Sequence, residues 1–456
     1  MTKLKINFVE PRANFNGFDR YTLPLLGSIY MGTILKERGH QVKVFSELFK
    51  PVFDEKSDSV HPSVLDADVI GISVMTPTAL RGYALARAIR KARPGIKLVI
   101  GGVHPTVMAD EALEFVDCVV RGEAEPLLPD LFDDLPSKEI VWGKRVEDIN
   151  NLPIPDLTLL QFAKSPLKWA PIATARGCPH DCTFCLVPGI WGNKFRFREV
   201  DLVLEELQLR YQSGHRNFFF YDDYFTAKRS RVIDLLERII KSPMKSLSWT
   251  AQTRADIAND KTILKLLKKS GCQALCLGLE SVNPATLKAY QKKQTFEEME
   301  SCVTRIREHG IWVHGMFVLG ADEDDLNTID ETVQFCKRLR MDSAQFSILM
   351  PIPGTKLFDK LDSQKRIFTK DWSLYDGLHV VFHTLKMSPL ELQKNVLRAF
   401  TKFYGFTNAW GPLAYLYVRY LLSKWKRFNG DFIESLSSLE SYYPHINLNL
   451  PWSKKD

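Results

Sequence analysis

The stretch IATARGCPHDCTFC, residues 172–185, decides how the fold of this chain is interpreted. It starts as a short run with β-branched residues, which is typical of a strand. It then places Cys178, Cys182 and Cys185 within eight positions. Thiolates spaced so closely are typical of a metal site, and βα barrels carry their chemistry in the loops that follow their strands. The stretch therefore predicts a metal centre in the loop after the first strand of a βα fold.

Three interpretations of these cysteines compete. A structural zinc site takes four Cys or His ligands, but His180 lies between the first two cysteines, where reaching the same ion is awkward. A disulfide leaves one thiol over and does not suit a reducing compartment. A [4Fe–4S] cluster held by three thiolates leaves its fourth iron open to a substrate. The spacing favours the cluster and leaves zinc open.

A second pattern, alternating strands and helices, continues after the cysteines. Strands are expected at 172–176, 217–223, 246–255, 274–281, 313–320 and 344–351, and helices at 199–212, 228–241, 261–269, 296–310 and 326–339. Six βα units are too few for an eight-fold barrel, so the pattern predicts a partial one.

The front of the chain shows the same alternation. Strands are expected at 4–9, 41–45, 68–75, 97–102 and 117–122, with helices at 25–38 and 79–92. Such alternation predicts a parallel, doubly wound sheet, which binds ligands beyond the carboxyl ends of its strands. Periodicity lapses over the proline-rich residues 126–170. The expected domains are a front domain at 1–140, a linker at 141–170, the barrel at 171–365 and a helical region at 366–456.

Composition limits the classes of function. The 456 residues carry a net charge of +7, which is too dilute to indicate nucleic acid as a partner. The first residues, MTKLKINFVEP, lack the apolar core of a secretory signal, and no run of about 18 apolar residues predicts a membrane span. Eight cysteines in so long a chain suit thiols and metal ligands. We therefore expect a cytoplasmic protein.

The Cys-x3-Cys-x2-Cys spacing, with Phe184 before the last cysteine, resembles the signature of the radical S-adenosylmethionine (SAM) superfamily. The resemblance implies that Cys178, Cys182 and Cys185 hold a [4Fe–4S] cluster whose open iron chelates the amino and carboxylate groups of SAM. An electron from an external donor of the flavodoxin or ferredoxin kind then cleaves SAM, and the resulting 5′-deoxyadenosyl radical abstracts hydrogen from unactivated carbon.

Further segments of the barrel resemble SAM-binding segments of this superfamily. The residues implied in cofactor binding are Phe184, Asp222, Asp223, Arg254, Glu280 and Ser281. YDDYF (221–225) stands where many members have Gly-Gly-Glu, which makes the two aspartates less certain counterparts. Structural alternatives stay open, because carboxylates at strand ends also cap helices and Arg254 has Asp256 as a nearby partner in sequence.

The front domain resembles the cobalamin-binding domain that precedes such barrels. The resemblance implies that Ser73, Thr76, Gly101 and Gly102 line the groove for the corrin and its nucleotide tail, where glycine lets the backbone approach closely. The Asp-x-His-x-x-Gly motif, whose histidine ligates cobalt from below, is missing: after the first strand the chain reads EPRANFNGF. A vestigial domain that binds nothing is the alternative.

Two other features separate neighbouring hypotheses. Methylthiotransferases of the superfamily carry three further cysteines in the front domain, whereas this chain has only Cys118 there. Cys272, Cys276, Cys302 and Cys336 fall within predicted elements and are interpreted as buried apolar residues.

The tail contains Tyr404, Phe406, Trp410, Tyr415, Tyr417 and Tyr420 before Lys424, Trp425, Lys426 and Arg427. It predicts either a helix that packs on the barrel or, less favoured, an interfacial helix in peripheral contact with a membrane.

Together the resemblances imply a cobalamin-dependent radical SAM enzyme. The reaction they favour is C-methylation of unactivated carbon in a small-molecule or lipid-like, hydrophobic substrate. Within the same architecture, oxidative cyclisation, ring rearrangement or carbon–carbon coupling is the alternative. A non-catalytic cobalamin or redox sensor ranks lower, because the chain has no appended DNA-binding or signalling module.

Overall fold

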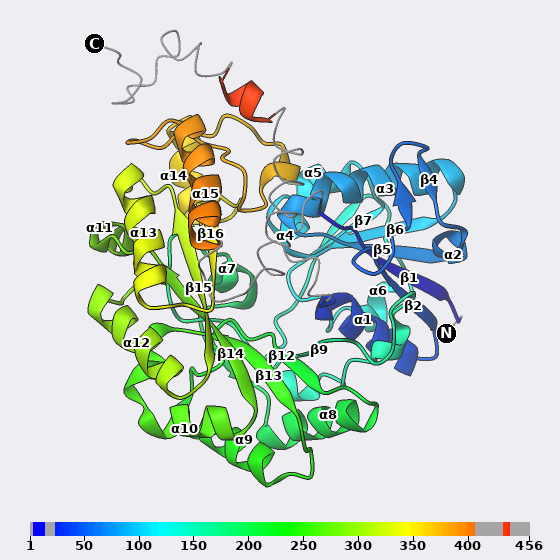
Figure 1. Cartoon of the computed structure of the whole chain (residues 1–456). Helices are drawn as coiled ribbons and strands as arrows, with labels where there is room; N and C mark the ends of the chain where they lie inside the picture. Colours follow the sequence, from blue (N-terminus) through cyan, green and yellow to red (C-terminus); the bar gives the residue numbers. More distant parts are fainter. Residues whose placement is uncertain (1–2, 14–22, 406–431, 438–456) are drawn as a thin grey trace. The chain divides into compact units, whose positions relative to one another are not determined.

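The computed structural model describes residues 3–13, 23–405 and 432–437, which belong to two compact units (Figure 1). The first unit consists of Met1–His180, Leu186–Asp223 and Asp371–Ser373. The second consists of Asp181–Cys185, Tyr224–Lys370 and Leu374–Asp456. The loop with the three cysteines therefore contributes residues to both units.

A six-stranded parallel sheet is the centre of the front domain. Its strands are β1 (Lys5–Glu10), β2 (Gln41–Ser46), β5 (Val69–Ser73), β6 (Lys97–Gly101), β7 (Cys118–Arg121) and β8 (Glu139–Trp142), in the order β2-β1-β5-β6-β7-β8. The direction of the strand order reverses between β1 and β5, which confirms the predicted doubly wound fold. A short two-stranded sheet, β3 (Phe53–Asp54) with β4 (Ser59–Val60), lies outside it.

Helices cover both faces of this sheet (Figure 1). On one face lie α1 (Leu26–Glu37) and α6 (Leu128–Leu131), and on the other lie α3 (Ala79–Ala92), α4 (Val103–Val107) and α5 (Ala109–Leu113); α2 is the single turn Pro62–Leu65. The core under α1 and α6 joins Ile6 and Phe8 of β1 to Leu26 and Ile29 of α1. Strand β8 and helix α6 were not predicted, because four residues are too few to show a period.

The first unit also contains the beginning of the barrel. Strand β9 (Ala170–Ile172) pairs in parallel with β12 (Asn217–Phe220), and α8 (Val200–Gln212) lies between them in sequence. The strand predicted at 172–176 is divided: β9 ends at Ile172, and β10 (Ala175–Arg176) pairs antiparallel with β11 (Arg196–Phe197). This hairpin and α7 (Val187–Trp191) frame the cysteine loop.

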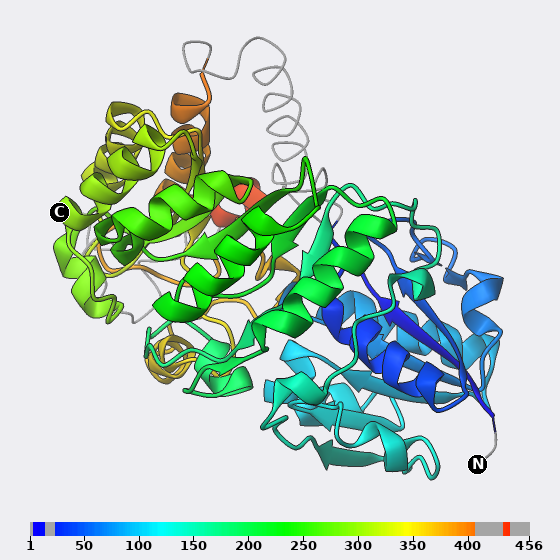
Figure 2. The same cartoon turned by 90° about the horizontal axis from the view of Figure 1, so that it is seen from below.

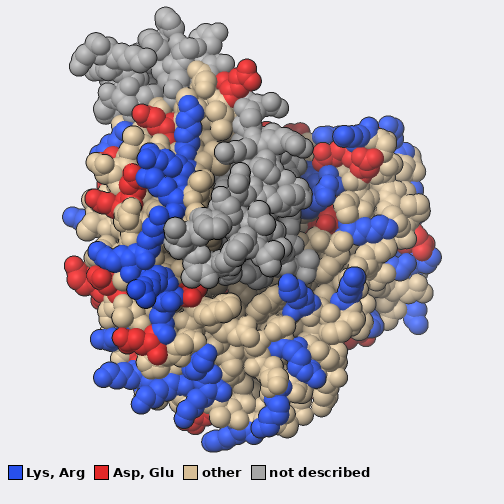
Figure 3. All heavy atoms as spheres, in the orientation of Figure 1, with Lys and Arg blue, Asp and Glu red and all other residues tan. Residues whose placement is uncertain are grey.

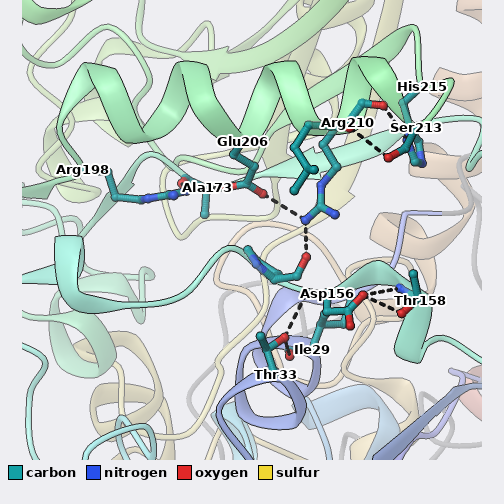
Figure 4. A network of polar contacts seen from close by, with 12 residues as sticks. Ile29, Thr33, Asp156, Thr158, Ala173, Arg198, Glu206, Arg210, Ser213 and His215 are labelled. Carbon is teal, nitrogen blue, oxygen red and sulfur yellow. Dashed lines mark hydrogen bonds and ion pairs between the residues drawn. The ribbon is translucent and has the colours of Figure 1, made fainter. Parts of the chain in front are cut away.

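A buried polar network fastens α8 to the segment that precedes the barrel (Figure 4). The Glu206 carboxylate accepts hydrogen bonds from Arg198 at 2.5 Å and from Arg210 at 3.2 Å. Arg210 also donates to the carbonyl of Pro155, and the Asp156 amide donates to the Thr33 hydroxyl on α1 at 2.8 Å. The network thereby links α8, the connector and the front domain within one unit.

The second unit holds the remaining strands of the barrel. β13 (Ser248–Thr253), β14 (Cys272–Glu280), β15 (Trp312–Leu319) and β16 (Ser343–Ile348) pair in parallel and in chain order. Helices α9 (Arg229–Lys241), α10 (Lys261–Lys269), α12 (Phe296–Glu308) and α13 (Leu326–Arg338) lie on the outside of these strands (Figures 1 and 2). The two units together contain the six parallel strands that the partial-barrel prediction required.

Further helical segments complete the second unit. They are α11 (Pro284–Ala289), α14 (Lys356–Ser363), α15 (Pro389–Phe403) and a short segment at 432–437. The Tyr404 hydroxyl, just after α15, donates to the carbonyl of Ala344 on β16 at 2.8 Å. The other residues of the predicted aromatic and basic tail segment, from Phe406 to Arg427, lie outside the described residues.

No helix in the described part of the chain is both long and apolar enough to cross a membrane. Both basic and acidic side chains are present on the face of the molecule seen in Figure 3.

Candidate active site

The loop with the three cysteines starts and ends at the β10–β11 hairpin, in which Arg176 and Arg196 are register partners. Gly177 opens the loop with φ +86°, and a Cβ atom there would come within 2.2 Å of the Lys194 carbonyl oxygen. The Cys178 amide donates to the Gly192 carbonyl at 3.1 Å. The first cysteine is therefore held by backbone contacts from the far end of its own loop.

The other two cysteines belong to the second unit, where Cys182 and Cys185 are half-buried. The Cys185 amide donates to the Cys182 carbonyl at 3.1 Å, which makes this segment a tight turn. Between them, Thr183 donates its amide to the Tyr290 carbonyl at 3.2 Å and accepts the Leu357 amide at 3.0 Å. Thr183 thereby anchors the turn of Cys182 and Cys185 within the second unit.

Phe184 anchors this turn through an aromatic contact. Its ring meets the buried ring of Tyr290 edge to face, with centroids 4.9 Å apart. This geometry is favourable for aromatic pairs. The contact gives the aromatic position before the last cysteine a packing role within the second unit.

A buried ion pair lies near Cys182. Lys292 Nζ is 2.7 Å from Glu280 Oε1, and both side chains are about nine-tenths buried. Burial raises the pKa of the Cys182 thiol, while the nearby charges of Lys292 and Arg254 act in the opposite direction. Burial has the larger effect, so the pKa of the free thiol is raised overall. Lys292 was missed at the sequence level, because no spacing rule relates it to the cysteines.

Glu280 ends β14 in the left-handed region, with φ +62°. A non-glycine residue in that region costs of order 1–3 kcal/mol and is most frequent at functional sites. Next to it, Ser281 is fully buried, and its hydroxyl accepts the Asn283 amide at 3.1 Å. The GLES segment therefore combines backbone strain, a buried carboxylate and a local cap.

Arg254 follows β13, and its guanidinium donates to the Lys293 carbonyl at 3.3 Å and lies over the Tyr224 ring. Asp256 instead accepts the Tyr224 hydroxyl at 2.6 Å. Among the described residues no ion pair joins Arg254 to Asp256. The alternative that Arg254 only forms an ion pair with Asp256 is therefore not supported. The positive charge of Arg254 remains next to the segment of Cys182.

The two aspartates after β12 differ in their surroundings. The Asp222 carboxylate is buried and accepts the Thr174 and Ala175 amides at 2.6 and 3.1 Å, as well as the Thr174 hydroxyl. It thereby fixes the chain between β9 and β10, just ahead of the cysteines. Asp223 is exposed to solvent, yet the protein around it and the charge of Asp222 raise its pKa to about 6.

The residues predicted to line the cobalamin groove lie at the carboxyl ends of β5 and β6. Ser73 ends β5 and Gly101 ends β6, and the two are register partners. Gly102 has φ +108°, and a Cβ atom there would stand 2.4 Å from the Val74 carbonyl oxygen. Thr76 is buried, with its hydroxyl 3.3 Å from His104 Nδ1. Position 102 therefore requires glycine, because its backbone packs closely against the backbone of Val74.

Where the histidine motif is missing, β1 ends in a buried carboxyl group. Glu10 is only 3% exposed, and burial raises its pKa to about 7, against the effect of the nearby Ser28 and Ser46 hydroxyls. It lies next to the point where the strand order reverses.

Among the described residues, no three His, Cys, Asp or Glu side chains are gathered as a metal site. Cys272, Cys302 and Cys336 are buried as predicted, and Cys276 is half-buried.

Comparison with known families matches both parts of the chain. Residues 172–336 match the radical SAM superfamily, and residues 20–132 match the B12-binding domain. Bacteriochlorophyllide d C-12(1)-methyltransferase of Chlorobaculum tepidum is 30% identical, over 77% of this chain and 78% of that protein. An uncharacterized methyltransferase of Pyrococcus horikoshii is 28% identical, over 84% of this chain and 88% of that protein.

Two further similarities bear on the reaction and the fold. The anaerobic magnesium-protoporphyrin IX monomethyl ester cyclase of Rubrivivax gelatinosus is 24% identical, over 88% of this chain and 77% of that protein. Among solved structures, the radical SAM methyltransferase TsrM from Kitasatospora setae, with cobalamin and a [4Fe–4S] cluster bound, superimposes with a TM-score of 0.65. It is 17% identical, over 81% of this chain and 76% of that chain, and it supports the fold alone.

Proposed function

Because the chain belongs to the radical SAM superfamily, in the branch whose barrel follows a B12-binding domain, we propose that it methylates an unactivated carbon of a small molecule. The observation that carries the proposal is the 30% identity to a named C-methyltransferase over 77% of this chain. Its cofactors are those of the two domains: a [4Fe–4S] cluster, SAM and cobalamin. When bound, they supply a carbon-centred radical and a transferable methyl group.

The cluster is assigned to Cys178, Cys182 and Cys185. All three are half-buried thiols, and no other cysteine of the chain lies in the loop. The pKa of the Cys182 thiol is raised by burial, and the positive charges of Lys292 and Arg254 offset part of that rise. The donor set fits a cluster with one open iron.

SAM is assigned to the second unit, on the side of Cys182. Arg254 and Lys292 offer positive charge to a carboxylate, and Glu280 offers a fixed carboxylate to a donor group. Because the carboxylate of Asp222 accepts two backbone amides, its contribution is to hold the chain before the cysteines. The exposed Asp223 belongs to the first unit, so its proposed contact with the methionine amino group is based on the family resemblance alone.

Cobalamin is assigned to the carboxyl edge of the front sheet. Ser73, Gly101 and Gly102 lie at the ends of two adjacent strands, where doubly wound sheets bind ligands. Position 102 admits only glycine without displacing Val74. Buried Thr76 next to His104 supplies a hydroxyl on the same edge.

The substrate is proposed to be hydrophobic. The support is that the relatives' names refer to bacteriochlorophyllide d and, over 52% of this chain, to a hopanoid. An external protein donor of the flavodoxin or ferredoxin kind is proposed as the source of the electron that the radical reaction needs.

A second candidate is an oxidative ring closure on the same radical chemistry. It is favoured by the similarity to the cyclase of Rubrivivax gelatinosus, which extends over 88% of this chain. Both reactions consume SAM, but only methylation transfers its methyl group. The two are therefore separated by following that group.

The test uses the full chain, reconstituted without oxygen with iron, sulfide and cobalamin, and supplied with SAM labelled in its methyl group. With a bacteriochlorophyllide as the probe, we expect label in the product together with 5′-deoxyadenosine. If SAM is cleaved and the product is cyclised but carries no label, methylation is refuted and the second candidate is supported. Cys182→Ala should abolish SAM cleavage, whereas Cys276→Ala, outside the loop, should retain it. A reconstituted chain without iron–sulfur absorption would overturn both candidates.

A further inference from the structure

One carboxylate of the front domain binds both ends of the cysteine loop. Glu123 follows β7 and is 2% exposed. Its Oε1 and Oε2 atoms accept two parallel hydrogen bonds from Arg196, each 2.7 Å long. Oε1 is also 3.3 Å from Arg176 Nη1. All of these residues belong to the first unit.

The two arginines that Glu123 binds lie at the two ends of the cysteine loop. Arg176 is the last residue of β10, directly before Gly177 and Cys178, and Arg196 is the first residue of β11, where the loop returns. They are opposite each other in the hairpin. The 19 residues from 177 to 195, which contain all three cysteines, are closed at their base by the pairing of β10 with β11, and Glu123 binds the arginine on each side of that pairing.

Other contacts orient the same two guanidinium groups. Arg196 donates to the Trp191 carbonyl at 2.8 Å and to the Val146 carbonyl at 2.5 Å. Arg176 donates to Glu125 at 2.6 Å and lies over the Trp191 ring, 5.0 Å from its centroid. The arginines therefore position the end of α7 as well, which follows the last cysteine.

Electrostatics makes Glu123 hard to replace. Two guanidinium groups opposite each other in a hairpin repel, and both are about nine-tenths buried, where water screens little. Burial alone raises the pKa of Glu123, but the hydrogen bonds from Arg196 and the Val146 amide outweigh it and hold the pKa below its usual value. The carboxylate consequently stays charged at neutral pH and is the counterion of Arg196, while Arg176 is shared between Glu123 and the closer Glu125.

We propose that Glu123 is a positioning residue for the cluster: by binding Arg176 and Arg196 together, it fixes the place of Cys178. The sheet of the B12-binding domain, and not the barrel alone, then determines the geometry of the cluster loop. This inference rests on the proposed function, because it takes the loop to be the cluster site.

The chain offers a matched control. Glu47, which follows β2 in the same sheet, is also fully buried and binds Arg81 through two parallel hydrogen bonds of 2.5 and 2.8 Å. The substitutions Glu123→Gln and Glu47→Gln remove the same charge from the same kind of pair in the same domain. Only the first touches the cluster loop.

The experiment measures iron per chain, the iron–sulfur absorption and the electron paramagnetic resonance spectrum of the reduced cluster with SAM, all on the full chain. We expect Glu123→Gln to lower cluster occupancy at limiting iron by about 10-fold, as the loss of an outer partner of a metal site does. Glu47→Gln should keep wild-type occupancy. Glu123→Asp retains the charge with a shorter reach and should restore part of the occupancy.

A second measurement does not depend on cluster loading. Hydrogen exchange of the chain without cofactors should become faster over residues 175–197 in Glu123→Gln and stay unchanged there in Glu47→Gln. Wild-type occupancy and spectrum in Glu123→Gln, or equal losses in both variants, would overturn the positioning role. A wild-type chain that takes up no cluster would instead refute the proposed function.

Discussion

Removing the charge of Glu206 should destabilise the first unit more than any exposed substitution on α8. Glu206 is fully buried between Arg198 and Arg210, which are 3% and 6% exposed (Figure 4). In Glu206→Gln both guanidinium groups stay buried without their counterion. Breaking a buried ion pair in this way costs about 3–5 kcal/mol. Because about 2–4 °C of melting temperature correspond to 1 kcal/mol in a unit of this size, we expect a loss of about 6–20 °C.

The assay is thermal unfolding of the full chain, followed by far-ultraviolet circular dichroism. The matched control is Glu205→Gln, the same change at the neighbouring, exposed position of α8. It should melt within about 1 °C of the wild type, as surface substitutions do. A triple replacement of Arg198, Glu206 and Arg210 by methionine should recover part of the loss, because it leaves no uncompensated charge. The reasoning is refuted if Glu206→Gln melts as late as Glu205→Gln.

Three further predictions concern the two cofactor sites and pH. Gly102→Ala should abolish retention of cobalamin through gel filtration, because its Cβ atom would stand 2.4 Å from the Val74 carbonyl oxygen. The control Gly95→Ala, where a Cβ atom meets open space, should retain cobalamin. Equal retention by both variants would contradict the assignment. Glu280→Gln removes the partner of Lys292 and should weaken SAM binding in calorimetry by about 10-fold, and unchanged binding would remove Glu280 from the site. Burial lowers the pKa of His314 to about 4, below its unfolded value of about 6.5. The unfolded chain therefore binds the proton first, and stability is lost as pH falls from about 6.5 to about 4. The stability advantage of the wild type over His314→Gln should shrink over that range, and a constant difference between their melting temperatures would contradict the prediction.

Regular elements were the most predictable part of the fold. The helix expected at 79–92 is α3, Ala79–Ala92, and five barrel helices begin and end within two residues of their predicted bounds. Long amphipathic segments carry their period in the local sequence, so tertiary contacts only confirm it. The prediction was wrong at 172–176, where the strand divides between β9 and β10. The Asp222 carboxylate holds that break from a distance of 48 residues, which no local pattern indicates.

The features of the candidate site that depend on the spacing of residues in the sequence could be predicted. Three cysteines in eight positions predict a metal centre, and Gly101 and Gly102 predict a close approach of backbone and ligand. Lys292 was not predictable, because its role depends on a buried contact with Glu280. An isolated lysine in a loop is far more often a solvated residue.

The sequence by itself was sufficient to predict the fold class, the family and the thiols that are assigned to the cluster. Only the tertiary structure decided which buried charges pair with one another. Glu123 lies 53 and 73 residues before the arginines that it binds, and Glu206 binds the arginines that fasten α8. The physical reason is that a buried charge is tolerated only next to an opposite charge, and such a partner is brought by folding from any part of the chain. Spacing therefore identifies ligands, whereas burial identifies the residues that hold them in place.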